Sequence, residues 1–562
     1  MSARESDDPD ETPLGVHDLR VVVALGRERL AGLLTSQEEA VCDRIMALSG
    51  PPAALFARLS ARTRTAVAVD ALDLADVPDA HAAVDALVAE GLLAEGARWD
   101  ERLVLATVPV LKAWCAARDL PGSGRRADLV ARLLPARPVP AAERIVRRPH
   151  VALVRRLERA ALMDKRADRG RLVAERLGHV RFAEYTPTGG AVLYRDRAHL
   201  LAWEALFAEG EGVRPARAVL GLQAGHAEAP GRLSLRRRLT GVVVEHAHQL
   251  RRGGEPAEAR AWLDALRIVG AGEHALARAR CLEDDGEVGR AFEVLQAGLD
   301  TSDGADRLAL HRTGRRLGRA LHRAWIPDPP LRKAPRRSLA LEPGDARHRP
   351  TWRVDGADRF VEDAVARVIA GAGRQVLRAE GGILRALFVH LFADALLAPV
   401  AGQLPVPRLP GPLDLGRPAF AARRPGLVFA ALDAIARGEA EARIAAAVGA
   451  LDGVRLAGVP ISEDLGTTLI LAARSLGPSG LRAVLGPILA HGLRATRGLP
   501  DLLVLAGDEV RLADAHPTRI TAGALWVEVK GPGDTLSDEQ RVWLDRLVRA
   551  GAAAEVWDVR GR

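Results

Sequence analysis

The sequence predicts a multidomain, mostly helical chain that ends in an α/β domain. Three observations support this fold class. Apolar residues recur at helical spacing over much of the chain, a faint repeat lies within residues 215–325, and strand-like runs flank a helix near the C-terminus. With 562 residues the chain is too long for one hydrophobic core, so we expect about three or four domains.

The composition is that of a soluble globular protein, with 48% hydrophobic and 27% charged residues. The formal net charge of +8 favours a polyanionic partner such as nucleic acid. The three cysteines, Cys42, Cys115 and Cys281, match no zinc-binding spacing and indicate a reducing compartment. The acidic N-terminus is unlike a signal peptide, and no apolar run reaches the length of a membrane span. We therefore expect a cytoplasmic protein with no membrane partner and no small-molecule organic cofactor.

The N-terminal part divides into a tail and a helical region. Residues 1–30 begin as an acidic stretch and are expected to form a flexible tail. Residues 31–100 show helical spacing and end in a glycine-closed helix, followed by a short apolar run at Leu92 and Leu93. This order is typical of winged-helix modules.

Residues 101–140 contain two short amphipathic helices that flank a basic, glycine-rich loop. This pattern resembles a SAP module, a helix–loop–helix unit that binds DNA. The resemblance implies that Lys112, Arg125 and Arg126 contact phosphates, which positions DNA without reading its sequence. The alternative is a plain helical hairpin with a glycine-rich turn.

A basic region follows a proline-rich stretch and is expected to be helical over residues 141–214. Four of its arginines are candidate DNA contacts: Arg147, Arg148, Arg155 and Arg156. Arg147 and Arg155 are eight residues apart, as are Arg148 and Arg156, so each pair would fall on nearby faces of one helix. A DNA-facing stripe and an ordinary solvated face both fit this pattern.

Residues 215–325 are expected to form a helical-repeat scaffold of the tetratricopeptide type. Three pairs of residues recur at an offset of 32: Gly254 with Gly286, Ala259 with Ala291, and Leu263 with Leu295. Such layers usually support or bind rather than catalyse. Residues 326–356, rich in proline and arginine, are expected to link this scaffold to a final domain at residues 357–562.

Two strand-like runs in the final domain carry two acids and a lysine. Asp501 opens the apolar run 502–505, whereas Glu528 and Lys530 lie two apart in a second run. Strand alternation puts the Glu528 and Lys530 side chains on one face. If the runs pair as a hairpin, Asp501 and Glu528 can converge on a divalent cation, for which carboxylates suit Mg²⁺ or Mn²⁺.

The scarcity of lysine favours chemistry at this position over surface charge. The basic residues are nearly all arginine, and the only lysines are Lys112, Lys165, Lys333 and Lys530. Lysine is a compact, tunable point charge, whereas arginine is a planar, permanently protonated fork. The alternative is an ordinary turn at Asp501 and a weak charge pair on a solvated strand face.

Two further features accompany these strands. Glu380 stands at the start of an apolar helix, where an acid also suits the helix dipole. A helix from Ser537 through Gln540 follows Lys530, and a last strand-like run covers residues 554–559. Strand–strand–helix–strand with acids on the hairpin describes an α/β nuclease core.

Four segments carry a more specific resemblance: EGGILRALFVHLFADALL, LDLGRPAFAARRPG, RGLPDLLVL and VEVKGPGDTLSDEQRVWL. They resemble the Fanconi-associated nuclease family, whose catalytic module is the VRR-NUC type of the PD-(D/E)xK nucleases. The resemblance implies a nuclease that cuts 5′ flaps and trims DNA from 5′ to 3′ in interstrand crosslink repair. Branched or flapped DNA would be its partner.

The resemblance also implies roles for individual residues. The metal ligands would be Glu380, Asp501, Glu528 and the backbone carbonyl of Val529. Lys530 matches the catalytic lysine, and Gln540 matches a polar position on the following helix. Residues from about 507 to 523 lengthen the gap between the two strands and should form a surface loop.

Two other functions fit parts of the sequence. A non-catalytic DNA-binding scaffold with a decayed nuclease domain should have lost one of the key residues, yet Glu380, Asp501, Glu528 and Lys530 are all present. A Holliday-junction-type resolvase would be a small symmetric dimer, which fits a long multidomain chain poorly.

Overall fold

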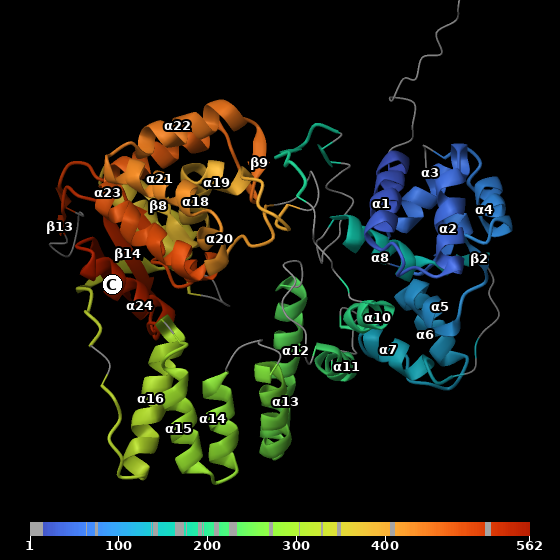
Figure 1. Cartoon of the computed structure of the whole chain (residues 1–562), viewed down its shortest axis with the longest axis horizontal. Coiled ribbons are helices and arrows are strands. Elements are labelled where there is room, and N and C mark those ends of the chain that lie inside the picture. The colour runs from blue at the N-terminus through green and yellow to red at the C-terminus, as the bar shows by residue number, and fades with distance from the viewer. Residues whose placement is uncertain are drawn as a thin grey trace, which may run out of the picture. The chain divides into compact units, whose positions relative to one another are not determined.

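The computed structural model of the chain describes residues 15–62, 64–72, 77–136, 138, 144–162, 174–175, 177–188, 194, 196–206, 213–223, 233–268, 274–302, 304–327, 330–345, 350–404, 411–511 and 519–562. The chain folds into two compact units. The first comprises Met1–Val180 with Leu193–Leu200, and the second Arg181–Val192 with Leu201–Arg562. Figure 1 shows their helices and strands.

The first unit is mostly helical. Its described helices are α1 (Val16–Arg29), α2 (Ser36–Ala47), α3 (Gly50–Ser60), α4 (Ala80–Ala89), α5 (Trp99–Leu105), α6 (Val108–Ala116), α7 (Arg126–Leu133) and α8 (Val151–Leu162). Helix α1 contradicts the flexible tail expected over residues 1–30 for residues 16–29, whereas residues 1–14 lie outside the described part of the structure. Val16, Leu19, Val22 and Val23 are buried at helical spacing, so this segment gains more from packing on α8 than its acidic beginning suggested.

A small antiparallel sheet in the first unit draws strands from distant parts of the sequence. Its order is β1 (Ala66–Ala68), β3 (Ile145–Arg147) and β2 (Ala94–Glu95). The central strand β3 follows α7, so helices α5 to α7 are inserted between two strands of one sheet. The helix expected through Arg147 and Arg148 is therefore wrong, because Ile145 and Val146 are buried as strand residues and α8 begins only at Val151.

Helices α5, α6 and α7 share a small core of their own. Leu103, Leu111, Cys115, Leu129 and Leu133 are buried together in it. Trp99 closes this core by donating a hydrogen bond from its indole nitrogen to the Leu133 carbonyl oxygen at 2.8 Å.

A series of helices precedes the main sheet of the second unit. They are α10 (Arg197–Ala205), which continues from the first unit, α11 (Val213–Gln223), α12 (Leu233–Arg252), α13 (Pro256–Ile268), α14 (Ala275–Asp284), α15 (Val288–Gly298) and α16 (Gly304–Ala320). The predicted helical repeat is confirmed. Gly254 and Gly286 each follow a helix with positive φ, and the paired alanines and leucines of α13 and α15 are fully buried. Each repeat is thus a helical hairpin.

A seven-stranded sheet forms the core of the second unit, in the order β7-β6-β5-β15-β14-β11-β8. Its strands are β5 (Arg336–Pro343), β6 (Trp352–Val354), β7 (Ala357–Arg359), β8 (Val376–Arg378), β11 (Leu502–Val504), β14 (Leu525–Lys530) and β15 (Ala553–Gly561). Strands β11 and β14 pair antiparallel, and β15 lies parallel to β14 beyond helix α24 (Asp538–Arg549). The predicted α/β core at the C-terminus is confirmed.

The linker expected over residues 326–356 instead supplies strands to this sheet. Strand β5 pairs parallel with β15, and β6 pairs antiparallel with β5. Leu339 and Leu341 alternate with less buried residues along β5 and enter the core. The proline and arginine content of the segment concealed this alternation.

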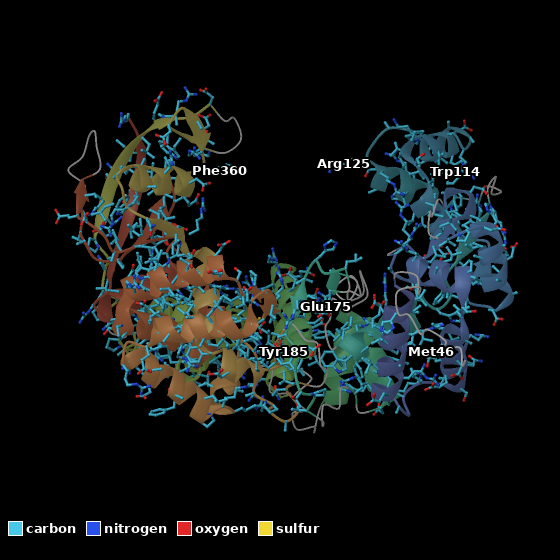
Figure 2. All side chains as sticks on the ribbon, turned by 90° about the horizontal axis from the view of Figure 1, so that it is seen from above. Met46, Trp114, Arg125, Glu175, Tyr185 and Phe360 are labelled. Carbon is cyan, nitrogen blue, oxygen red and sulfur yellow. The ribbon has the colours of Figure 1, made fainter. Side chains whose placement is uncertain are left out.

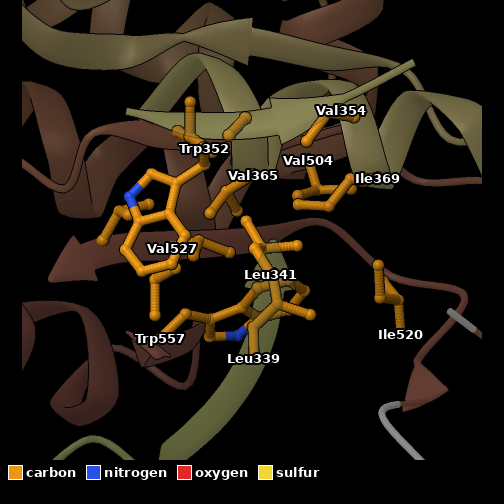
Figure 3. Close-up of a cluster of buried hydrophobic side chains, with 14 of the residues drawn as sticks. Leu339, Leu341, Trp352, Val354, Val365, Ile369, Val504, Ile520, Val527 and Trp557 are labelled. Atoms are coloured by element: carbon orange, nitrogen blue, oxygen red, sulfur yellow. The ribbon is translucent and has the colours of Figure 1, made fainter. Parts of the chain in front are cut away.

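One face of the sheet packs against helix α17 (Val361–Gly371), as Figure 3 shows. Val527 and Val529 of β14 lie on this face with Val504, Val365 and Ile369. Alternation along β14 therefore places Glu528 and Lys530 on the opposite face, where helix α24 lies.

The second unit contains further helices. They are a π-helical turn η4 (Ala379–Ile383), α18 (Leu384–Leu391), α19 (Ala393–Leu397), α20 (Pro418–Ala422), α21 (Pro425–Ala436), α22 (Ala440–Leu451), α23 (Glu463–His491) and a short 3₁₀ turn η5 (Leu493–Thr496). A minor three-stranded sheet combines β4 (Arg181–Phe182), β9 (Val454–Leu456) and β10 (Val459–Pro460). Within the described ranges no helix is both long and apolar enough to cross a bilayer.

A surface loop was expected between β11 and β14, of which residues 512–518 lie outside the described part of the structure, and the described part is not all loop. It contains the strand pair β12 (Val510–Arg511) and β13 (Arg519–Ile520). Ile520 is buried in the sheet core. Arg374 is buried as well, and it donates hydrogen bonds to the carbonyl oxygens of Asp508 at 3.0 Å and Thr521 at 2.7 Å.

Candidate active site

The two strand acids meet at one end of the sheet. Leu502 of β11 pairs with Val527 of β14, so the next pair along this register is Asp501 with Glu528. The Asp501 carboxylate accepts a hydrogen bond at its Oδ2 from the Val529 backbone N–H at 2.8 Å. This bond fixes one acid against the strand that carries the other.

Lys530 is directed into the protein rather than into solvent. It is 8% exposed, and its Nζ lies 2.9 Å from Glu528 Oε1. Glu528 is completely buried, and burying a carboxylate is costly unless the charge is compensated. The ammonium of Lys530 provides that compensation from the same face of the same strand.

Gln540 of α24 connects both charged groups through its carboxamide. Its Nε2 donates to Glu528 Oε1 at 2.5 Å, and its Oε1 accepts from Lys530 Nζ at 3.0 Å. The same Oε1 accepts from the Ser537 backbone N–H at 2.9 Å. Ser537 caps α24 in return, because its hydroxyl accepts from the Gln540 N–H at 3.3 Å.

Helix α24 is held close to the loop that leads into Asp501. Gly498 lies in this loop with φ +75, and a Cβ there would come within 2.5 Å of Glu539 Cβ and 2.7 Å of the Gln540 nitrogen. Only glycine permits this approach. Trp543 adds a hydrogen bond from its indole nitrogen to the Ala495 carbonyl oxygen at 2.7 Å, so Gln540 and Asp501 are positioned together.

Glu380 follows the strand on the other side of β11. The Ala379 N–H donates to the Asp501 carbonyl oxygen at 2.8 Å, so the backbone at position 380 comes next to Asp501 in the π-helical turn η4. The side chain of Glu380 lies outside the described part of the structure. Among the residues that are described, no group of three or more His, Cys, Asp and Glu side chains could hold a metal.

The donor set at this end of the sheet fits a hard divalent cation. Carboxylates of Asp501 and Glu528 meet on neighbouring strands, with the carbonyl of Val529 one residue further along. Oxygen donors of this type suit Mg²⁺ and Mn²⁺. The backbone of η4 brings position 380 next to Asp501, and the ligand set with Glu380 stays a prediction.

Three of the seven candidate DNA-binding residues have structural roles: Arg126, Arg148 and Arg156. Arg148 is buried and donates to the carbonyl oxygens of Leu59, Arg62 and Arg64. Arg156 is buried and forms an ion pair with Glu38. Buried guanidinium groups are not accessible to phosphate, so the structure contradicts DNA contact by Arg148 and Arg156.

Arg126 lies at the start of α7 and fastens the end of α5. Its guanidinium donates to the carbonyl oxygens of Leu103 at 3.1 Å, Val104 at 2.7 Å and Ala106 at 3.3 Å. The residue is exposed, but its guanidinium donors already form hydrogen bonds with carbonyl oxygens at the end of α5.

The other four candidates are exposed: Lys112, Arg125, Arg147 and Arg155. Figure 2 labels Arg125, which precedes helix α7. Arg147 lies on β3, whereas Arg155 lies on α8, so they do not share the helical stripe that their spacing suggested.

Two contributors to the site were missed from the sequence. Gly498 gave no local signal, because its requirement arises from the approach of α24. Ser537 did give one, since Ser537-Asp538-Glu539-Gln540 has the spacing of a capping box. That motif fixes a cap and, through it, the orientation of Gln540.

Two family models match the chain. The VRR-NUC domain model matches residues 439–561, which include β11, β14, α24 and β15. The SAP domain model matches residues 105–137, which include α6 and α7 and confirms the predicted SAP module.

Two plant proteins named Fanconi-associated nuclease 1 homolog are similar to part of the chain. The one from Oryza sativa subsp. japonica is 31% identical over 189 residues, which cover 34% of this chain and 19% of that protein. The one from Arabidopsis thaliana is 29% identical over 209 residues, covering 37% of this chain and 22% of that protein. The matched part thus spans about a fifth of these relatives.

Solved structures share the fold of nearly the whole chain. A crystal structure of paFAN1 bound to DNA with a 2-nucleotide 5′ flap and a gap has a TM-score of 0.75, and covers 98% of this chain and 99% of that one. A second, with a 1-nucleotide 5′ flap, has a TM-score of 0.78 and covers 98% and 100%. Both are 24% identical to this chain. The chain therefore contains a SAP domain and a VRR-NUC domain, is similar over part of its length to the Fanconi-associated nuclease 1 homologs, and shares the fold of paFAN1 over nearly its whole length.

Proposed function

We propose that the chain is a structure-specific DNA nuclease that hydrolyses phosphodiesters with the help of a divalent metal ion. The observation that carries this proposal is the convergence of Asp501, Glu528, Lys530 and Gln540 at one end of the sheet. The names of the plant relatives, and the 5′-flap DNA in the paFAN1 structures, support the same activity.

The residues of the site have distinct roles in this proposal. Mg²⁺ or Mn²⁺ would be held by Glu380, Asp501, Glu528 and the Val529 carbonyl. The ion supplies a water of lowered pKa and neutralises phosphate charge. Lys530 orients the attacking water or stabilises charge on the phosphorus oxygens. Gln540 holds Lys530 and Glu528 in one arrangement through its single carboxamide.

The substrate we propose is branched DNA, cut at 5′ flaps and trimmed from 5′ to 3′ in interstrand crosslink repair. Hydrolysis would leave a 5′-phosphate and a 3′-hydroxyl. Contacts from the exposed Lys112, Arg125, Arg147 and Arg155 would reach phosphates only, so the DNA would be recognised by shape and not by sequence. We propose a cytoplasmic location for this activity.

One assay tests the proposal and separates it from its alternatives. Labelled 5′-flap, 3′-flap, four-way and linear DNA are each incubated with Mg²⁺, Mn²⁺ or a chelator. Cutting of the 5′ flap that needs the metal supports the proposal. Binding without cutting would indicate a scaffold, and paired symmetric cuts in the four-way junction would indicate a resolvase.

Asp501→Asn provides the sharpest variant for this assay. The asparagine keeps an oxygen that can accept the Val529 N–H but loses the negative charge that a metal needs. We expect cleavage to fall more than about 10³-fold, equivalent to about 4 kcal/mol of barrier, while DNA binding measured by fluorescence anisotropy is retained. Cleavage within about tenfold of the unsubstituted protein would reject Asp501 as a metal ligand.

A further inference from the structure

The backbone N–H of Ser537 lies beside the catalytic set without belonging to it. It donates to Gln540 Oε1 at 2.9 Å, the same oxygen that accepts from Lys530 Nζ at 3.0 Å. We propose that Ser537 is a positioning residue: its N–H sets the direction of the Gln540 carboxamide, and the carboxamide in turn positions Glu528 and Lys530. This inference rests on the nuclease function proposed above.

The two ends of a carboxamide differ in the hydrogen bonds that they form. The oxygen accepts hydrogen bonds, and the amino group donates them. A backbone N–H can only donate, so the Gln540 oxygen must face Ser537. The amino group then faces Glu528 Oε1, to which it donates at 2.5 Å. In the reverse orientation the amino group would face two donors and the oxygen would face a carboxylate.

Ser537 is a better reference than Lys530 for this orientation. The lysine ammonium lies at the end of a side chain with four rotatable bonds, whereas the main chain fixes a backbone N–H at a helix cap. The cap is reinforced by the Ser537 hydroxyl, which accepts from the Gln540 N–H at 3.3 Å. The main chain of α24 therefore determines where both charged groups of β14 are held.

The orientation of the Gln540 carboxamide should affect Glu528, which is one of the proposed metal ligands. Glu528 is completely buried, and partners in the outer shell of a metal ligand affect affinity by about 10- to 100-fold. If the Gln540 carboxamide turns freely, Glu528 loses its neutral donor and Lys530 loses its acceptor. Metal affinity should then fall even though every proposed ligand is still present.

The backbone geometry of Ser537 permits a specific test. Its φ of −69 lies within the range that proline adopts, so Ser537→Pro removes the N–H at little expected cost in strain. Ser537→Ala is the matched variant, since it loses the hydroxyl cap but keeps the N–H. Gln540→Met removes both hydrogen-bonding groups of the side chain with little change in size.

The experiment measures Mn²⁺ affinity of the full chain by isothermal titration calorimetry, without DNA, and cleavage of a 5′-flap substrate in parallel. We expect Ser537→Pro to weaken Mn²⁺ binding about tenfold, and Ser537→Ala to weaken it at most about threefold. In a Gln540→Met background, Ser537→Pro should add nothing, because the effect passes through Gln540.

Two results would overturn the inference. One is equal Mn²⁺ affinity for Ser537→Pro and Ser537→Ala, and the other is an undiminished effect of Ser537→Pro in the Gln540→Met background. Thermal melts verify folding. If the proline variant is unfolded, Gln540→Met alone decides, since unchanged Mn²⁺ affinity there would equally reject the role. Failure of the unsubstituted chain to bind Mn²⁺ or to cut DNA would instead reject the proposed function.

Discussion

The buried charges of strand β14 and the buried guanidinium of Arg148 in the first unit are compensated in different ways. On β14 the buried Glu528 and Lys530 pair with each other and share Gln540. In the first unit Arg148 is buried against three main-chain carbonyl oxygens. Side chains that neutralise one another can exchange partners with a metal or a phosphate. An arginine held by main-chain carbonyl oxygens cannot exchange them for a phosphate unless the surrounding main chain unfolds. Such an arginine therefore stabilises the fold.

The largest effect expected from this comparison tests whether the Lys530 ammonium acts in catalysis or only compensates the buried Glu528 carboxylate. Lys530→Arg keeps a positive charge but replaces a compact ammonium with a wider planar group. We expect 5′-flap cleavage to fall about 10²- to 10³-fold, as when a single transition-state donor is lost. Lys333→Arg is the matched control, because Lys333 is exposed, and it should cut normally.

Lys530→Met adds the case without charge. It should cleave no better than Lys530→Arg, because both lack the ammonium that faces Glu528 and Gln540. Near-normal cleavage by Lys530→Arg would contradict the prediction, because any buried positive charge on β14 would then support cleavage.

The next effect separates two neighbouring arginines of the first unit. Arg148→Ala leaves the carbonyl oxygens of Leu59, Arg62 and Arg64 without their donor, so we expect a loss of about 2–4 kcal/mol in the free energy of unfolding. Arg147 is exposed on β3, and Arg147→Ala should change that free energy by less than about 0.5 kcal/mol. Urea denaturation followed by circular dichroism measures both, and equal losses would contradict the assignment of Arg148 as a fastener.

The same contrast explains which features could be predicted from sequence. The convergence of Asp501, Glu528 and Lys530 could be predicted because side chains alternate along a strand and the two strands pair as a hairpin. Arg147 and Arg148 are chemically identical neighbours, and only contacts with residues more than 80 positions away distinguish them. Strand β5 was missed because proline and arginine around it hid the alternation of Leu339 and Leu341. The role of the Ser537 N–H has no side-chain signature beyond the capping box.

A third test uses the buried ion pair of the first unit. Burial raises the pKa of Glu38, but hydrogen bonds from the Arg197 side chain, the Thr35 N–H and the Arg156 side chain outweigh it, and the pKa falls to about 2. A carboxyl with a lowered pKa stabilises the folded state above its unfolded value, and this contribution is lost as pH falls through the folded value.

Glu38→Gln should therefore destabilise the first unit at neutral pH by about 1–3 kcal/mol. The difference from the unsubstituted chain should shrink as pH falls from about 4.5 to about 2. Hydrogen exchange in α2 and α8 measures it. Glu39→Gln is the control, since the Glu39–Arg27 pair is more exposed than the Glu38–Arg156 pair and exposed pairs contribute only about 0.2–1 kcal/mol. A difference that persists at pH 2 would contradict the assignment.

The smallest effect concerns DNA affinity and the SAP domain. Arg125 and Arg126 are adjacent, yet the Arg126 guanidinium fastens the end of α5 through three carbonyl oxygens. If Arg125 contacts a phosphate, Arg125→Ala should lower the slope of log affinity against log salt by about 1. Arg126→Ala should instead lower the thermal stability of the SAP domain and leave a slope closer to that of the unsubstituted chain. Titration of flap DNA over a range of salt concentrations, followed by anisotropy, measures both slopes. Equal reductions would mean that main-chain fastening and phosphate contact are compatible in one arginine, and the contrast drawn for Arg148 would then hold only for guanidinium groups that are fully buried.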